Sequence, residues 1–115
     1  MKTIILTKKH FKDQEYIGKF ELHTYQDFNI QIEGGLGYVS FKKGIYVNGY
    51  ILAEAGSGIK AGLGIKAGLG IKAGEGIEAG WGIEAGLGIK AGLGIKAGLG
   101  IKAGEGIKAL CPTLS

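Results

Sequence analysis

The chain has 115 residues, with 24 glycines, one proline and a net charge of +4 from 14 lysines and no arginine against 10 acidic residues. This length suits one domain with a modest core, and the lack of arginine weighs against dedicated phosphate or guanine recognition. Cys111 is the only cysteine and no apolar run approaches the ~20 residues of a membrane-spanning helix, which excludes a disulfide scaffold and predicts a cytoplasmic protein with no membrane partner.

Residues 1–29 follow no repeat, and we expect them to form a small N-terminal β cap. A β-branched run at 3–7 and an alternating segment at 16–25 predict two strands, with a turn at 12–15 between them. Because a pair of strands is not stable alone in water, the cap must pack on the rest of the chain. The aromatic residues of this half, interleaved with lysines, fit the core of such a cap better than a base-stacking platform.

Residues 30–58 contain degenerate copies of a six-residue unit. Val39, Ile45 and Ile51 are spaced by six, and Ile59 follows after a two-residue insertion near Ser57. We interpret this segment as the first coils of a repetitive fold.

Residues 59–109 repeat the unit nine times, beginning with Ile59-Lys60-Ala61-Gly62-Leu63-Gly64. The glycines alternate gaps of four and two, which excludes collagen, where glycine occupies every third position. The regular array predicts an all-β fold, a parallel β-solenoid. Residues 110–115 break the pattern, and Pro112 suits a C-terminal cap because proline donates no hydrogen bond to a neighbouring strand.

The nine copies can be compared with one another as substitutions at one site. The isoleucine and the alanine of the unit never change, whereas the residue between the two glycines is leucine, Glu75, Trp81 or Glu105. Because an unpaired buried carboxylate is costly, we expect isoleucine and alanine inside, lysine outside, and glycine-X-glycine at exposed corners where glycine provides a positive φ. Strict alternation is the competing interpretation, in which the leucines are core.

The charges favour three sides for each coil. In a coil of 18 residues, Glu78 lies between Lys60 and Lys96, and Glu84 lies between Lys66 and Lys102. Opposite charges on adjacent strands attract, and a coil of 12 residues would place more lysines against lysines. We therefore predict a three-sided β-helix.

Leu63-Gly64-Ile65-Lys66-Ala67-Gly68 resembles the unit of hexapeptide-repeat proteins, which form a left-handed parallel β-helix. In that family's frame Leu63 is the core residue and Ile65 lies at a corner, so the handedness stays open here. The family includes acyltransferases with a catalytic histidine in or beside the coils. Neither His10 nor His23 lies within the repeats, so acyl transfer is not expected.

Other chemistry has little support in the sequence. The glycine-rich repeat resembles a phosphate-binding loop, but no helix pattern follows it. His10, His23 and Cys111 lack the close-spaced pair typical of zinc ligands. We therefore predict a non-catalytic protein with no catalytic residue, cofactor or metal site.

Two surfaces remain as candidate binding sites. The first is a row of exposed apolar corners with a central tryptophan, a composition typical of binding hot spots or an oligomer interface. Its candidate residues are Leu63, Trp81, Leu99, Leu69, Leu87 and Leu93. The second is an electrostatic face of stacked lysines that lacks any glutamate, formed by Lys72, Lys90 and Lys108.

The Ile-Lys/Glu-Ala-Gly array also looks like small proteins of bacteriophages and prophages, some of which inhibit host defence, including anti-CRISPR proteins. This resemblance implies an inhibitor that binds a host defence complex in the host cytoplasm. Our leading hypothesis is thus a binding module that contacts a protein partner or a second copy. The alternatives are binding of a nucleic-acid backbone by the lysine face, and a structural or self-assembling element.

Overall fold

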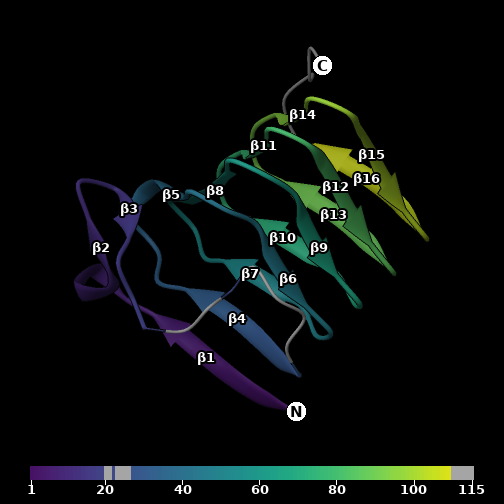
Figure 1. Ribbon diagram of the computed structural model, residues 1–115. Coiled ribbons are helices and arrows are strands. Elements are labelled where there is room, and N and C mark those ends of the chain that lie inside the picture. Colours follow the sequence, from purple (N-terminus) through teal and green to yellow (C-terminus); the bar gives the residue numbers. More distant parts are fainter. Residues whose placement is uncertain (20–21, 23–26, 110–115) are drawn as a thin grey trace.

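The computed structural model describes residues 1–19, 22 and 27–109, which form a three-sided parallel β-solenoid of about 4 turns (Figure 1). The predicted fold class is confirmed. Its three sheets, here named A, B and C, run along the three sides of the solenoid. Within the described ranges, no helix is long and apolar enough to cross a membrane.

Each complete coil contributes one strand to each of the three sheets, whereas the N-terminal strands join sheets A and B only. Sheet A contains β1 (Lys2–Leu6), β4 (Phe28–Ile32), β7 (Ile51–Ala53), β10 (Ile71–Ala73), β13 (Gly88–Ala91) and β16 (Gly106–Ala109). Sheet B contains β2 (Phe11–Lys12), β3 (Glu15–Tyr16), β5 (Gly37–Phe41), β8 (Ser57–Ala61), β11 (Ile77–Ala79) and β14 (Ile95–Ala97). Sheet C contains β6 (Ile45–Val47), β9 (Ile65–Ala67), β12 (Gly82–Ala85) and β15 (Gly100–Ala103).

The register within each sheet confirms the coil length predicted from the charges. Glu78 pairs with Lys60 on one side and Lys96 on the other, so that each coil adds eighteen residues. Glu84 stands between Lys66 and Lys102 in the same way. The earlier coils are longer: Val39 pairs with Ile59 at a spacing of twenty residues, and Ile30 pairs with Ile51 at a spacing of twenty-one.

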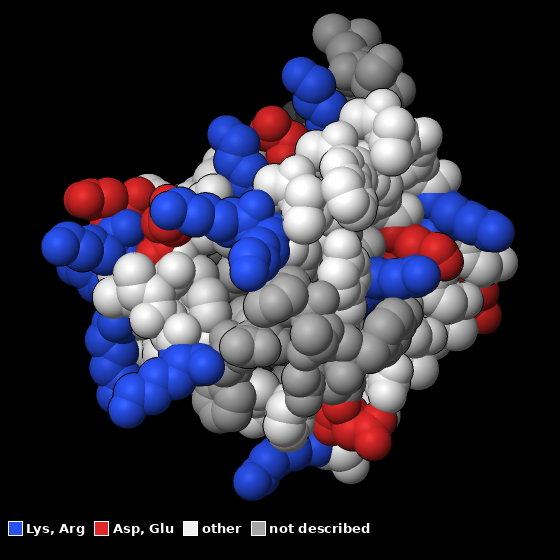
Figure 2. Space-filling view, in the orientation of Figure 1, with Lys and Arg blue, Asp and Glu red and all other residues white. Residues whose placement is uncertain are grey.

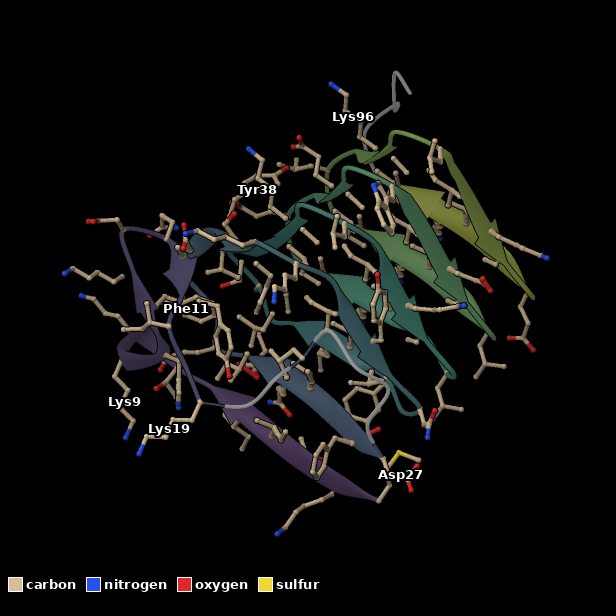
Figure 3. The ribbon with its side chains drawn as sticks, viewed as in Figure 1. Lys9, Phe11, Lys19, Asp27, Tyr38 and Lys96 are labelled. Carbon is tan, nitrogen blue, oxygen red and sulfur yellow. The ribbon has the colours of Figure 1, made fainter. Side chains whose placement is uncertain are left out.

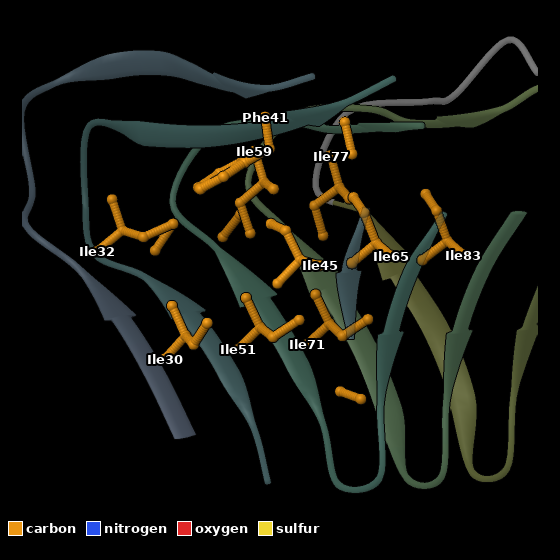
Figure 4. Packing of buried hydrophobic residues seen from close by; sticks show 14 of the residues in the cluster. Ile30, Ile32, Phe41, Ile45, Ile51, Ile59, Ile65, Ile71, Ile77 and Ile83 are labelled. Atoms are coloured by element: carbon orange, nitrogen blue, oxygen red, sulfur yellow. The ribbon is translucent and has the colours of Figure 1, made fainter. Parts of the chain in front are cut away.

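The core is a stack of isoleucines and alanines that point into the prism (Figure 4). Every repeat isoleucine from Ile59 to Ile95 is at most 1% exposed, and the alanines from Ala61 to Ala91 are also buried. Burying each isoleucine contributes roughly 1.5–3 kcal/mol relative to leaving it exposed. The core side chains become smaller along the chain, because Phe41 and Val47 occupy the position that alanine takes in the later coils.

The corners are exposed, as the comparison of the repeats predicted. Trp81 is 52% exposed and Leu99 is 80% exposed. Ile65 lies in the core, whereas Leu63 lies at a half-buried corner, so the hexapeptide frame that places Leu63 in the core does not apply.

The expected reason for the corner glycines was wrong. Among the described glycines only Gly35, Gly37, Gly56, Gly100 and Gly106 have positive φ, and most corner glycines of the repeat do not. The first glycine of each corner is instead required by the close stacking of coils. A Cβ atom at Gly80, Gly86 or Gly98 would lie less than 3.0 Å from the backbone carbonyl of the preceding corner.

The N-terminal segment differs from the expected pair of strands. β1 pairs in parallel with β4 as the first strand of sheet A. The expected turn is present, but it joins the short antiparallel strands β2 and β3, with Asp13 and Gln14 at positive φ. The proposed division of the chain at residues 29, 58 and 109 stays a prediction.

An aromatic cluster joins the hairpin to the solenoid. The ring centroids of Phe11 and Tyr16 both lie within 6 Å of that of Phe41, at 5.8 and 5.4 Å. The Gln14 side-chain amide donates to the Leu36 and Tyr38 carbonyls, both at 2.7 Å. These aromatic residues therefore belong to the packing of the N-terminal end, which supports the structural interpretation over a base-stacking platform.

Candidate protein-binding surface

The six predicted stripe residues occupy three different corners of the prism. Leu63, Trp81 and Leu99 stack on consecutive coils between sheets B and C, where each corner amide donates to the carbonyl one coil earlier (3.2 and 2.8 Å). We call these three residues the corner ridge. Leu87 stacks on Leu69 at a second corner. The structure therefore brings together three of the six residues.

The third corner carries the remaining candidate. Leu93 follows Glu75 there, because its amide donates to the Glu75 carbonyl at 3.2 Å. A leucine stacked on a carboxylate offers a smaller apolar surface than the corner ridge. Leu93 is thus a matched exposed position outside the ridge, at 41% exposure.

A shallow groove of about 530 Å³ runs beside the corner ridge on sheet C. We call it the sheet C groove. Its floor is the column Gly64, Gly82 and Gly100, its first wall is formed by Trp81 and Leu99, and its second wall is the stacked series Tyr46, Lys66, Glu84 and Lys102. Uncharged surface lies between groups of charged side chains on the face shown in Figure 2.

The floor of the groove is open because glycines line it. A Cβ atom at Gly82 would make only ordinary contact, 3.4 Å from the Gly100 carbonyl, and at Gly100 it would meet nothing within 4 Å. Packing therefore does not demand a glycine at Gly82, unlike Gly80 at the other end of the same corner. Side chains at these floor positions would fill the groove.

Tyrosine rings lie over the first glycines of two such columns. A Cβ atom at Gly64 would lie 3.2 Å from the Tyr46 hydroxyl oxygen and 3.3 Å from its Cε1 atom. Tyr38 covers Gly58 on sheet B, on the side of the molecule where Lys96 also lies (Figure 3). Burial, and then the charge of Glu78 and Glu75, raises the pKa of Tyr38, so this ring is neutral at physiological pH.

Positive side chains outnumber negative ones along the sheet C groove. Lys66 and Glu84 form an ion pair with Nζ and Oε2 3.8 Å apart, about half exposed, which contributes little to stability. Lys43 precedes the corner ridge on the previous coil, since its carbonyl accepts from the Leu63 amide at 3.4 Å. With Lys102 at the far end, the groove has an excess of positive charge.

The electrostatic face has the register predicted for it. Lys90 pairs with Lys72 and with Lys108 on sheet A, and all three side chains are exposed. Leu52 precedes them in the same column, beside a groove of about 410 Å³ next to Tyr50. Like charges on neighbouring strands repel, so this column is less favourable than the alternating columns of sheets B and C.

The histidines and the cysteine are not brought together in the part of the chain that the structure describes. The His10 Nδ1 atom accepts from the Thr7 amide at 2.9 Å, which is a local turn contact, and His23 and Cys111 lie outside the described residues. The described ranges contain no group of three or more histidine, cysteine or acidic residues placed to bind a metal ion. Sequence reasoning did not find the groove, because it placed the second glycine of each corner in the turn and not on an open floor.

Comparison with protein-family models, with curated proteins and with solved structures finds no match to this chain.

Proposed function

We propose that the protein is a non-catalytic binding module that contacts another protein through the corner ridge. The observation that supports this proposal is the stacking of three large apolar side chains on consecutive coils, with Trp81 52% and Leu99 80% exposed. Single exposed apolar residues are normal, but a contiguous row with a central tryptophan is typical of binding hot spots. The hydrogen-bonded coils beneath the row hold it in place, which reduces the entropy lost on binding.

The test is to compare partner binding by the wild type and by corner variants. We expect Trp81→Ala and Leu99→Asp each to weaken binding by about 30-fold, which corresponds to the ~2 kcal/mol of a hot-spot residue. Both side chains lie outside the core, so the melting temperature should change little.

Leu93→Asp is the matched control, because it places the same charge at a corner outside the ridge. It should leave binding unchanged. Wild-type affinity in both ridge variants, with intact folding, would contradict the proposal.

The narrower role implied by the resemblance to small phage proteins is inhibition of a host defence complex. We propose it as the finer form of the same function, since such an inhibitor needs a compact binding surface and no active site. It predicts that a host defence effector is captured by the wild type and is lost with Trp81→Ala.

A second candidate function is binding of a nucleic-acid backbone by the electrostatic face. It is favoured by one observation, the unrelieved stacking of Lys72, Lys90 and Lys108 on sheet A. If stability alone governed these positions, a glutamate at Lys90 would be preferable, as at Glu78 and Glu84.

Lys90→Glu tests this alternative with two measurements. Stability at low salt should rise by about 0.5–1 kcal/mol, because a carboxylate then lies between two lysines, and the gain should shrink at high salt. Affinity for single-stranded nucleic acid should fall, with a weaker salt dependence. Lys96→Glu changes the net charge equally but stacks on Glu78, and equal losses of affinity in both variants would reject the face.

A further inference from the structure

The sheet C groove has the dimensions and charges to bind a proline-rich segment in the polyproline II conformation. We propose that its occupant is a partner segment with two prolines one helical turn apart and an acidic residue on each side. This inference rests on the proposed protein-binding function and specifies the chemistry of the partner.

The first argument is the spacing of the two aromatic residues. Tyr46 lies on β6, and Trp81 lies at the corner just before β12, two coils further along the solenoid. Neighbouring strands are about 4.8 Å apart, so that two coils span about 9.6 Å. One turn of polyproline II has three residues and rises about 9.3 Å. The backbone positions of Tyr46 and Trp81 are therefore spaced like prolines at positions i and i+3 along the solenoid axis.

The second argument concerns hydrogen bonding. The groove lies on the face of a sheet, and its backbone groups pair with neighbouring coils, as the Ile45 amide does with the Gly64 carbonyl at 3.0 Å. An added β-strand would find no backbone partners on this surface. Polyproline II has no internal backbone hydrogen bonds, and proline has no amide hydrogen to donate. Such a segment therefore leaves few backbone groups unpaired when it lies on a sheet face whose own backbone groups are already hydrogen-bonded.

The third argument is the width of the groove. Three residues of extended chain separate the Trp81 wall from the Glu84 wall, which is at most about 10 Å. An α-helix with its side chains is 10–12 Å across and would rest above the floor without contacting it. A narrower polyproline II segment reaches the glycine floor between the walls.

The fourth argument is charge. Lys102 lines the far end of the groove, and Lys43 lies on the coil of Tyr46, at the corner position that precedes Leu63, which places the two lysines three coils apart, or about 14 Å. Five residues of polyproline II span about 15 Å. The negative side chain of Glu84 already pairs with Lys66. The complementary sequence is therefore acidic-Pro-X-X-Pro-acidic.

The test uses the full chain and a synthetic peptide of that pattern, Glu-Pro-Leu-Ala-Pro-Glu with blocked ends. Trp81 is the only tryptophan, so its fluorescence reports binding at the site directly. We expect a saturable change in emission with the wild type. Tyr46→Ala should weaken binding about tenfold or more, and Leu93→Ala, at another corner, should not change it.

Two comparison peptides separate polyproline II recognition from simpler attraction. Alanine in place of both prolines keeps the charges, and lysine in place of both glutamates keeps the prolines. Both should bind about tenfold more weakly or not at all. Equal binding of the alanine peptide, or no saturable signal with the proline peptide, overturns the inference.

The proposed function and this inference fail in different ways. If Trp81→Ala loses partner binding but the proline peptide causes no saturable change in fluorescence, the proposed function is supported and the inference is rejected. A wild-type dimer in sedimentation experiments that Trp81→Ala dissociates would identify a second copy as the occupant, which also rejects the inference. If Trp81→Ala and Leu99→Asp both bind the partner with wild-type affinity, the proposed function itself is rejected.

Discussion

Replacing Gly86 by alanine is expected to lower the free energy of unfolding by about 3 kcal/mol or to prevent folding. The new methyl group would lie less than 3.0 Å from the Gly68 carbonyl oxygen of the preceding corner and 3.1 Å from its carbonyl carbon. Both are backbone atoms of a coil whose own hydrogen bonds fix its position, because the Gly86 amide donates to the Ala67 carbonyl at 3.0 Å. Overpacking of this kind costs roughly 1–3 kcal/mol or more, since the coils must separate locally.

Gly88→Ala is the matched control, two residues away at the other end of the same corner. Its Cβ atom would lie 3.5 Å from the Gly106 carbonyl, an ordinary contact. The substitution should change the free energy of unfolding by less than ~1 kcal/mol, and denaturant titration measures both variants. Gly86 and Gly88 both lack positive φ, so a difference between the variants isolates the stacking of corners. Equal stabilities would show that the coils can separate at no cost.

Most of the solenoid could be predicted from the sequence because the repeats supply their own comparison. A position that accepts Leu87, Trp81 and Glu75 favoured an exposed corner over the competing frame, and the exposure of Trp81 and Leu87 confirms it. The charges then favoured three sides, because a coil of 12 residues would place more lysines against lysines, and the register of Glu78 and Glu84 confirms the longer coil. Burial and charge thus constrain the frame and the coil length independently.

The reason for the corner glycines could not be predicted, since it depends on the distance between coils. Glycine serves both a positive φ and a close backbone approach, and only coordinates distinguish the two at Gly80 or Gly86. The place of β1 in sheet A was also not predicted. The run at 3–7 contains no glycine and so lacks the feature that identified the later strands.

The candidate surface was predicted in part. Eighteen-residue spacing was enough to place Trp81 between Leu63 and Leu99. It was not enough to show that Tyr46 shares a groove with Trp81 and Leu99, because Tyr46 belongs to a degenerate coil and a different column. Residues outside the perfect repeats, such as Tyr46, can line a surface groove whose position the period of the repeat does not predict.

Ser57→Ala is expected to lower the free energy of unfolding by about 2 kcal/mol. Ser57 occupies the corner position of the half-buried Glu75 and the exposed Leu93, yet it is fully buried. Its hydroxyl donates to the Glu33 carbonyl at 2.5 Å and accepts from the Leu36 amide at 3.0 Å. Alanine removes both bonds, and each partly buried group left unpaired costs about 1–3 kcal/mol, less where water can reach it.

Hydrogen exchange gives the sharper measurement of this effect. The Leu36 amide should exchange much faster in Ser57→Ala, beyond the change expected from the loss of global stability, because its acceptor is gone. Ser40→Ala is the control, since Ser40 lies on the outer face of β5 in register with Lys60, where a substitution should change stability by about 0.5 kcal/mol or less. Unchanged protection of the Leu36 amide from exchange in Ser57→Ala would mean that contacts other than the Ser57 hydroxyl hold the 33–37 loop in place.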